Sequence, residues 1–203
     1  EQGWGAVPAA SLTSASSDAS FRRYFRWQGA GRSLIVMDAP PDKEAVLPFI
    51  QVANLLKDAG LHVPLILEES QEKGFLLLSD LGSKTYLSAL SPSNAKALYR
   101  DASQALVQMQ HASREGVLPA YDDATLQREL DLFDEWYLKR HHQYNLSDEE
   151  KNQLHTIFRL IKENNLAQSR VYVHRDFHSR NLMIRPDQSL AVIDFQDAVV
   201  GPV

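Results

Sequence analysis

The sequence contains no cysteine, and this absence excludes two kinds of chemistry. No disulfide can form and no thiolate can bind a metal ion, so a metal site would have to use oxygen or nitrogen ligands. No apolar run approaches the roughly 20 residues that span a bilayer, and no signal peptide opens the sequence. These absences are typical of a soluble protein in a reducing compartment, and we expect a cytoplasmic protein that binds no membrane.

Positive charge is also scarce. The 203 residues include 21 Lys and Arg against 26 Asp and Glu, which gives a net charge of −5. Proteins that bind nucleic acid usually present a basic face, so we expect no nucleic-acid partner. A hydrophobic content of 44% is ordinary for a globular protein, and the length suits one large domain or two small lobes. The composition leaves the oligomeric state open.

One dense polar motif near the C-terminal end carries most of the functional information. The segment His174–Asn181 reads H-R-D-F-H-S-R-N, and Asp194 follows Asn181 by thirteen residues. This is the H-x-D-x-x-x-x-N … D-F layout of protein-kinase-like phosphotransferases. In this layout Asp176 accepts the proton of an attacking hydroxyl, and Asn181 and Asp194 offer hard oxygen ligands to Mg²⁺. His174 is interpreted as a structural residue of the catalytic loop.

A predicted hairpin explains how the two metal-ligand candidates meet. Short β-runs over 182–184 and 190–193 are joined by a turn over 185–189 that contains Pro, Asp and Ser. The hairpin starts beside Asn181 and returns at Asp194, so we expect these two side chains to lie close together. A chance match to the motif would not be expected to carry this hairpin as well.

The first 80 residues predict a small sheet with one helix. Strands are expected over 21–27, 33–37, 63–67 and 75–78, and a helix is expected over 43–59. The segment Phe21–Trp27 alternates aromatic and basic residues, a pattern that also occurs where proteins bind single-stranded nucleic acid. The acidic balance and the shortness of this run favour a half-buried strand. Asp42 is expected to cap the helix.

Beyond Gly82 the apolar pattern becomes helical. Helices are expected from Pro92 to Ala112 after a Ser91 cap, over 123–140, and from a capping box at Ser147–Glu150 onward. Their apolar stripes are expected to contain Leu126, Leu130, Phe133, Tyr137, Leu154, Ile157, Phe158 and Ile161.

The order of these elements predicts an α+β, bilobal, protein-kinase-like fold. A β-rich nucleotide-binding lobe is expected over 1–80, and a helical lobe with the catalytic and metal loops over 81–203. The backbone of Leu78, Asp80 and Leu81 is expected to form the hinge that contacts adenine. Because the sequence stops nine residues after the aspartate of the D-F motif, we expect the helical lobe to be C-terminally incomplete on the acceptor side.

Several blocks of the sequence resemble one known family. These blocks are Ser17–Arg26, Ile35–Pro41, Gly60–Pro64, Leu76–Gly82 and Asp194–Ala198. Over nearly its whole length the chain resembles the N-acetylmuramate/N-acetylglucosamine kinases, bacterial anomeric sugar kinases of cell-wall recycling in the aminoglycoside-phosphotransferase-like superfamily. The resemblance implies ATP-dependent phosphorylation of the anomeric hydroxyl of an amino sugar, which gives a sugar 1-phosphate. ATP and Mg²⁺ are therefore the expected cofactors.

The glycine-rich phosphate loop of protein kinases is missing. The corresponding turn is Ser16–Ser20, in which Ser17, Asp18 and Ser20 are the candidates for cofactor contacts. Short hydroxyl side chains and backbone N–H groups can meet phosphate oxygens. An ordinary polar turn is the alternative interpretation.

The lysine of the kinase pattern is also missing from the third strand, where Met37 stands instead. Arg22 and Arg23 are the nearest cations that could contact the phosphates, and the alternative is that both are solvated strand residues. Without the lysine, Glu44 is expected to have no ion-pair role. Gln196 replaces the glycine of D-F-G, which suits a constitutively assembled small-molecule kinase.

The acceptor site is the least determined part of the sequence. Glu135, His178, Arg180 and Gln196 are the candidates for substrate contacts, and Arg180 would suit the lactyl carboxylate of N-acetylmuramate. An aminoglycoside, choline or another amino alcohol is an alternative acceptor, and the acidic residues between Asp122 and Glu135 would suit a polycation. A non-catalytic nucleotide-binding protein is the alternative from another class, although the intact catalytic motif argues against it.

Overall fold

The computed structural model describes residues 12–17, 21–29 and 31–203. The chain divides by packing into two compact units. The first comprises Glu1–Met109 and Asp176–Asp197, and the second comprises Gln110–Arg175 and Ala198–Val203. This division does not coincide with the change of sequence pattern near residue 80, because the segments before and after the second unit group with the sheet. Within the described residues, no helix has the length and apolar character needed to cross a membrane.

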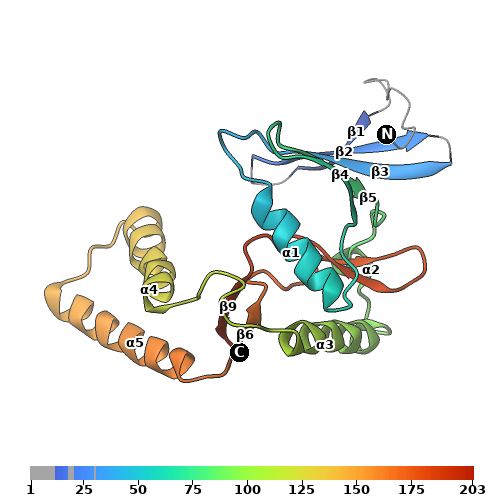
Figure 1. The fold of residues 1–203 in the computed structure, drawn as a ribbon. Coiled ribbons are helices and arrows are strands. Elements are labelled where there is room, and N and C mark those ends of the chain that lie inside the picture. Colours follow the sequence, from blue (N-terminus) through green and yellow to red (C-terminus); the bar gives the residue numbers. More distant parts are fainter. Residues whose placement is uncertain (1–11, 18–20, 30) are drawn as a thin grey trace. The chain divides into compact units, whose positions relative to one another are not determined.

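A five-stranded antiparallel sheet is the centre of the first unit (Figure 1). Its strands, in spatial order, are β1 (Leu12–Ser17), β2 (Arg23–Gly29), β3 (Arg32–Asp38), β5 (Phe75–Ser79) and β4 (Ile66–Ser70). Strand β1 is not expected from the sequence, because a run of small residues carries little strand preference. Arg26 lies opposite Ile35, and Ile35 lies opposite Leu78, so these side chains form a row across one face of the sheet.

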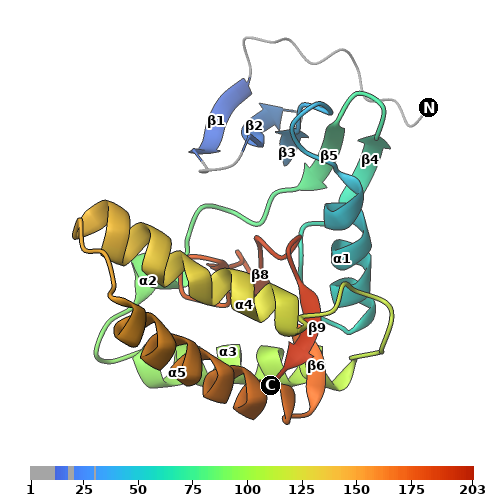
Figure 2. The same ribbon diagram turned by 90° about the vertical axis from the view of Figure 1, so that its left-hand side faces the viewer.

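Helix α1 (Leu47–Asp58) lies beneath this sheet in two views (Figures 1 and 2). Its buried side chains are Phe49, Ile50, Val52, Ala53 and Leu56. The expected start at Lys43 with an Asp42 cap is wrong, since Val46 is the N-cap residue and makes no side-chain cap bond. Pro48 gives the reason. A helix that began at Lys43 would place this proline in its interior, where it removes a hydrogen bond and clashes with the preceding turn.

The predicted β-hairpin belongs to the same unit as the sheet. It consists of β7 (Leu182–Ile184) and β8 (Leu190–Val192), and these bounds confirm the predicted hairpin. The hairpin is bonded to the segment before helix α2 (Tyr86–Ala89), where Ile184 N donates to Lys84 O at 2.8 Å. The chain that leaves β5 therefore supports the hairpin directly.

Helix α3 (Ala95–His111) begins about three residues later than expected. The Ser91 backbone N–H donates to Asn94 Oδ1 at 2.8 Å, and Asn94 Nδ2 donates to Ala89 O at 2.9 Å. The Ser91 cap is therefore wrong. Asn94 shapes the turn that precedes the helix, because its short amide side chain can bond to the backbone on both sides.

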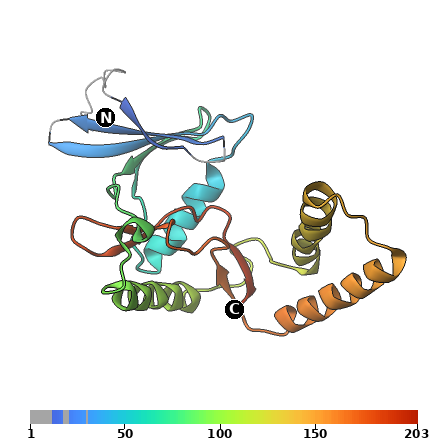
Figure 3. The same ribbon diagram turned by 180° about the vertical axis from the view of Figure 1, so that it is seen from behind.

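The second unit combines helices with a two-stranded sheet (Figure 3). Its elements are α4 (Asp123–Leu132), the π-helix η2 (Phe133–His141), α5 (Asp148–Leu166), β6 (Arg170–Val173) and β9 (Val199–Pro202). Helix α4 packs against α5, and the capping box expected at Ser147 and Glu150 is present. Tyr121 N donates to Val200 O at 2.8 Å and so joins the segment before α4 to β9.

The single helix expected over 123–140 is wrong in its second half. A π-helix has an i→i+5 hydrogen-bond pattern, so the apolar stripe of α4 does not continue through it in phase. Phe133 and Tyr137, expected in the core, are 43% and 50% exposed and stack on each other with ring centroids 5.4 Å apart. Ile157 and Ile161 of α5 are likewise exposed rather than buried.

Candidate functional site

The loop that carries Asp176 is held by hydrogen bonds among its own residues. The Asp176 carbonyl oxygen accepts from His178 N at 3.0 Å and from Asn181 Nδ2 at 3.1 Å, and Asn181 N donates to His178 O at 2.9 Å. Arg175 adopts φ +74°, a left-handed conformation that is uncommon outside glycine. His174, the structural candidate, is only 2% exposed. The loop therefore presents the exposed Asp176 side chain from a closely bonded turn.

Asn181 and Asp194 lie side by side, as the hairpin predicts. Asn181 Nδ2 donates to Asp194 Oδ2 at 3.1 Å, and Ile193 N donates to Asn181 O at 3.0 Å. Asp194 adopts φ +62°, and such backbone conformations cluster at functional sites. The hairpin thus brings together two residues that are thirteen positions apart.

The two residues that follow Asp194 hold it in place. Phe195 is fully buried and contacts Phe49 of α1, with ring centroids 5.0 Å apart. Gln196 is 8% exposed, and its Nε2 donates to Asp194 Oδ1 at 2.9 Å and to Asp197 Oδ2 at 3.4 Å. The Oε1 atom of Gln196 is buried without a hydrogen-bond partner among the described residues. The contacts of Gln196 are therefore those of a residue that orients Asp194.

A cleft of about 380 Å³ lies within the first unit, next to these residues. Ile35 and Leu78 of the sheet and Met183 of the hairpin give it apolar walls, and Asn181 and Asp194 also line it. This volume is typical of small-molecule sites, which combine apolar walls with a few polar groups. The cleft can hold a flat ring against aliphatic side chains with charged groups close by.

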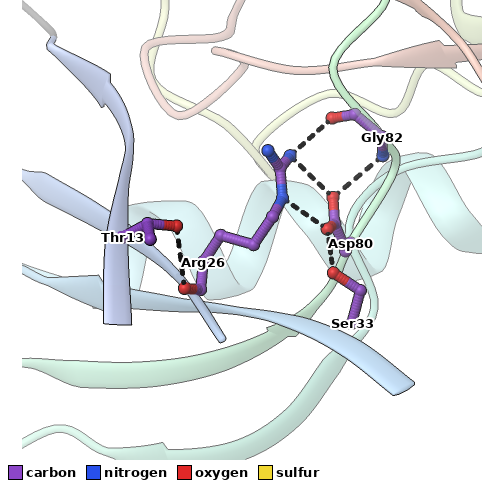
Figure 4. A network of polar contacts seen from close by, with 5 residues as sticks. All are labelled: Thr13, Arg26, Ser33, Asp80 and Gly82. Atoms are coloured by element: carbon purple, nitrogen blue, oxygen red, sulfur yellow. Dashed lines mark hydrogen bonds and ion pairs between the residues drawn. The ribbon is translucent and has the colours of Figure 1, made fainter. Parts of the chain in front are cut away.

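The expected hinge, Leu78–Leu81, borders this cleft, and its aspartate is the centre of a polar network (Figure 4). Asp80 Oδ2 accepts from Arg26 Nε at 2.6 Å and Ser33 Oγ at 2.5 Å, while Oδ1 accepts from Arg26 Nη2 at 3.0 Å and Gly82 N at 2.9 Å. Burial by itself raises the pKa of Asp80, but these hydrogen bonds outweigh it, so the pKa lies below its usual value. Because each carboxylate oxygen already accepts two bonds, only the backbone of Asp80 is available to a ligand.

The candidates for phosphate contacts in the first turn lie largely outside the described residues. Asp18 and Ser20 are not described. Ser17 is the last residue of β1, paired with Arg23, so it belongs to a strand and not to the expected turn. Arg23 forms an ion pair with Asp38 of β3, and its side chain is 63% exposed. The described partner of Arg23 is therefore a neighbouring strand.

The expectation that Glu44 has no ion-pair role is wrong. Arg22 Nη2 donates to Glu44 Oε2 at 2.7 Å, and the two side chains are only 10% and 18% exposed. The pair forms because α1 starts at Leu47, which leaves Glu44 in the preceding turn within reach of Arg22. Met37, at the position of the kinase lysine, is fully buried. This chain thus pairs its glutamate with an arginine instead of a strand lysine.

The acceptor candidates have different surroundings. Arg180 lines the cleft. His178 is exposed, and its Nδ1 accepts from Arg180 N at 3.3 Å, which leaves Nε2 as the ring atom that carries the proton in the neutral form. Glu135 lies on η2 in the second unit, where Arg140 Nε donates to it at 3.0 Å and Lys139 Nζ lies 3.7 Å away. Arg180 is the one of these three that the structure places on the cleft.

In the second unit, Arg175 is anchored to helix α4. It forms an ion pair with Glu129, and Tyr121 Oη donates to the same carboxylate. The Arg175 guanidinium also lies 5.8 Å from the centre of the Tyr121 ring. Burial and the hydrogen bond with Glu129 raise the pKa of Tyr121 to about 12, so Tyr121 keeps its proton at neutral pH. This network fixes the residue that directly precedes Asp176.

Asn181 and Asp194 fit a hard divalent cation by the chemistry of their donors. Carboxylate and amide oxygens suit Mg²⁺, which usually takes one or two protein ligands and completes its shell with water and phosphate. Asn181 uses its amide nitrogen for the bonds to Asp176 and Asp194, which leaves Oδ1 for a cation. In the described part of the chain, no group of three or more His, Asp or Glu could hold a metal ion. A cation here would therefore need ligands from a bound phosphate or from water.

Arg26 is not among the residues that the sequence predicts for this site. Strand alternation over 21–27 could have placed it on the same face as Tyr24, and both side chains line the cleft. No pattern could have identified Asp80 as its partner, because that residue is 54 positions away on the far side of another strand.

Comparisons with known proteins find relatives over the whole chain. The family described as "Phosphotransferase enzyme family" matches residues 11–203. An N-acetylmuramate/N-acetylglucosamine kinase of Pseudomonas aeruginosa PAO1 is 55% identical over 202 residues, and one of Pseudomonas putida KT2440 is 50% identical over 203 residues. Each alignment covers 100% of this chain and 60% of the relative. The chain thus spans about 60% of the length of these curated relatives.

Solved structures share the fold at low sequence identity. The streptomycin–ATP–APH(2'')-IIa ternary complex has a TM-score of 0.65 at 21% identity, and the match covers 94% of this chain and 67% of that one. Choline kinase LicA from Streptococcus pneumoniae has a TM-score of 0.62 at 16% identity, with 88% and 61% covered. These likenesses confirm the α+β, protein-kinase-like fold that the sequence predicts.

Proposed function

The chain belongs to the phosphotransferase enzyme family, and from this we propose that it carries the nucleotide cleft and catalytic loop of an ATP-dependent sugar kinase. The proposed reaction transfers the γ-phosphoryl group of ATP to the anomeric hydroxyl of N-acetylmuramate or N-acetylglucosamine. The products are ADP and the sugar 1-phosphate, as in cytoplasmic peptidoglycan recycling. The acceptor class is supported by the names of relatives that are 55% and 50% identical to this chain.

The observation that carries this proposal is the pairing of Asn181 with Asp194 on the cleft. The cleft is bordered by the hinge, and Asp176 belongs to the same bonded loop as Asn181. A purine would fit between Ile35 and Met183, with its edge toward the hinge backbone. Its phosphates would then extend toward the two hard oxygen donors. This arrangement matches the parts that phosphoryl transfer requires.

Asp176 is the proposed general base. As the anomeric oxygen bonds to the γ-phosphorus, its proton passes to the Asp176 carboxylate, and the bond from phosphorus to the β–γ bridging oxygen breaks to leave ADP. An anomeric hydroxyl is more acidic than an ordinary alcohol, so the base has less work to do. Catalysis therefore rests mainly on positioning and on stabilisation of charge. Arg180, which lines the cleft, can pair with the transferred phosphoryl group or with the lactyl carboxylate.

Asn181 and Asp194 would hold Mg²⁺, which would neutralise charge on the phosphates. The chain orients these ligands by its own contacts. Gln196 bonds to one oxygen of Asp194 and Asn181 bonds to the other, so the carboxylate is fixed at both ends. The packing of Phe195 on Phe49 holds the backbone that follows.

The test is a comparison of acceptors. The protein is incubated with ATP, Mg²⁺ and one acceptor at a time, and ADP release is measured for N-acetylmuramate, N-acetylglucosamine, kanamycin and choline. We expect ADP release with the amino sugars, with ³¹P NMR showing a sugar 1-phosphate. Turnover of kanamycin or choline, without turnover of either amino sugar, would show that the acceptor is an aminoglycoside or an amino alcohol instead. ATP binding without ADP release from any acceptor, both in these 203 residues and in a protein of the relatives' full length, would indicate a non-catalytic nucleotide-binding protein.

A further inference from the structure

The network around Asp80 crosses the sheet instead of following one strand. Arg26 lies on β2, and β3 separates β2 from β5. The Arg26 side chain passes over β3, where Ser33 joins it, and reaches Asp80 just after the end of β5. These contacts link β2 and β3 to the segment that follows β5 (Figure 4). The group is called the hinge clamp below and consists of Arg26, Ser33, Asp80 and Gly82.

The hinge clamp is well shielded and electrically balanced. The side chains of Arg26 and Asp80 are 21% and 8% exposed. Arg26 contacts both carboxylate oxygens through two nitrogens, the fork geometry that gives the strongest and most directional Arg–carboxylate pairs. With Asp80 beside it, Arg26 contributes little net positive field to the rest of the cleft. Loss of either partner would leave a shielded charge without its counter-charge.

The hinge clamp also occupies both backbone groups of Gly82. Arg26 Nη2 donates to Gly82 O at 2.8 Å, and Gly82 N donates to Asp80 Oδ1 at 2.9 Å. Gly82 adopts φ +92°, a conformation that glycine tolerates best. Leu81, by contrast, makes no backbone hydrogen bond within the described part of the chain, although it borders the cleft. The backbone of Leu81 is thus presented between two residues that the clamp holds.

We propose that the hinge clamp positions the backbone of Asp80 and Leu81 to recognise the nucleobase, and that Arg26 is a positioning residue for the base and not a ligand of the phosphates. This inference rests on the proposed nucleotide cleft. The competing role follows from the same geometry, because Arg26 lines the cleft and its Nη1 group is not used by the clamp. In that role Arg26 would replace the missing strand lysine and bind phosphate.

The two roles are separated by binding measurements with parts of the nucleotide. Isothermal titration gives the affinity of the protein and of Arg26→Gln for adenosine, for ATP with Mg²⁺, and for tripolyphosphate with Mg²⁺. We expect Arg26→Gln to weaken the binding of adenosine and of ATP by the same factor, about tenfold for the loss of a charged hydrogen bond. The affinity for tripolyphosphate should not change. Weaker binding of ATP and tripolyphosphate, together with an unchanged affinity for adenosine, would overturn the proposal.

Related variants test the fork geometry. Arg26→Lys keeps the charge but cannot form the fork, so we expect it to lose nearly as much adenosine affinity as Arg26→Gln. Asp80→Asn should give the same pattern, and the double variant Arg26→Gln/Asp80→Asn should lose less than the two single losses combined. Independent effects would contradict a shared clamp. Arg159→Gln, which removes the exposed pair with Glu163 on α5, is the matched control and should change no affinity.

A last comparison separates failure of this inference from failure of the proposed function. If Arg26→Gln does not fold, Ser33→Ala removes one hydrogen bond to the Asp80 carboxylate and leaves the pair with Arg26 in place, so it should still weaken the binding of adenosine by about threefold. An unchanged adenosine affinity in Ser33→Ala would then overturn the inference. If the unaltered protein binds neither ATP nor adenosine, the proposed function itself fails, and the inference falls with it.

Discussion

Two polar clusters of the first unit differ in how the chain builds them. The cluster of Asn181, Asp194 and Gln196, which is proposed to hold Mg²⁺ and is called the metal corner below, joins residues that are thirteen and two positions apart through one hairpin. The hinge clamp joins Arg26 to Asp80 across 54 positions and depends on the order of strands in the sheet. The metal corner can therefore form locally, whereas the hinge clamp exists only when the sheet is complete. We expect the first to matter mainly for chemistry and the second mainly for base binding and stability.

The largest effect should come from the loop beside the metal corner. Asp176→Asn removes the proposed base while leaving the loop bonds, which are made by the Asp176 carbonyl. We expect kcat to fall by roughly 10²–10⁴-fold, the range for general base catalysis, with the affinity for ATP close to that of the parent. Steady-state kinetics with N-acetylmuramate and a separate ATP titration measure the two quantities. A variant that keeps more than about a tenth of the parental kcat would exclude the general-base role.

The metal corner should be separable from the hinge clamp by the ligand that each affects. Asp194→Ala removes a hard oxygen ligand. We therefore expect the affinity for ATP with Mg²⁺ to fall by more than the roughly 10–100-fold that follows from the loss of a residue that only orients a metal ligand. Adenosine should bind as before, since it has no phosphate to reach the corner. Titration of ATP at several Mg²⁺ concentrations measures the effect. An unchanged Mg²⁺ requirement would show that Asp194 is not a metal ligand.

The hinge clamp should be visible in stability as well as in binding. Asp80→Asn keeps the shape of the side chain but leaves Arg26 without its counter-charge, so we expect the free energy of unfolding to fall by about 1–3 kcal/mol at neutral pH. Urea unfolding followed by circular dichroism measures this difference. Glu163→Gln, which breaks an exposed pair on α5, is the matched control and should change the free energy by less than about 0.5 kcal/mol.

The effect of Asp80→Asn should also depend on pH, with a sign fixed by the pKa of Asp80. The hydrogen bonds hold the folded-state pKa below the unfolded value of about 3.9. The stabilisation is therefore fully present above about pH 4 and is lost as the pH falls through the folded pKa. We expect the parent and Asp80→Asn to converge in stability under acid. A difference that stays constant into strong acid would argue against the ion pair with Arg26.

The smallest effect concerns the residue that orients the metal corner. Gln196→Met keeps the size of the side chain but cannot donate to Asp194, so we expect about a tenfold rise in the Mg²⁺ concentration needed for half-maximal activity. The free energy of unfolding should change little, because the buried Oε1 atom that has no described partner is removed as well. Metal titration at saturating ATP, with denaturation as the second readout, tests both statements. A loss of stability without a change in Mg²⁺ dependence would make Gln196 a packing residue.

The pairing of Asn181 with Asp194 could be predicted from the sequence because its geometry follows from one turn, whereas the bond from Gln196, a candidate for substrate contact, to Asp194 could not. Leu182–Ile184 and a return strand from Leu190 fix where Asn181 and Asp194 must lie, whatever the rest of the fold does. The hinge clamp could not be predicted, since strand alternation gives the face of Arg26 but not the neighbour of its strand. The ion pair of Glu44 with Arg22 is not predicted for a related reason. A helix expected to start at Lys43 contains Glu44, whereas α1 starts at Leu47 and leaves Glu44 in the preceding turn.

The second unit shows a different limit of sequence patterns. A stripe of apolar residues continues through Phe133 and Tyr137 at helical spacing, yet the backbone becomes a π-helix and both rings are exposed. Periodicity describes which residues share a face only while the number of residues per turn is constant. The capping box at Ser147 and Glu150, in contrast, depends on four adjacent residues and was predicted correctly.

The saturated carboxylate of Asp80 has a consequence for inhibitor design. An aspartate at a hinge would ordinarily attract compounds with a basic amine, because the amine could form a salt bridge there. Here such an amine would have to displace Arg26 and leave its guanidinium shielded and unpaired, which costs more than the new contact returns. Neutral heteroaromatic rings that form hydrogen bonds with the backbone of Leu81, which has no described backbone partner, should therefore be the better starting fragments. Positive charge is better placed at the other acid of the cleft, Asp194.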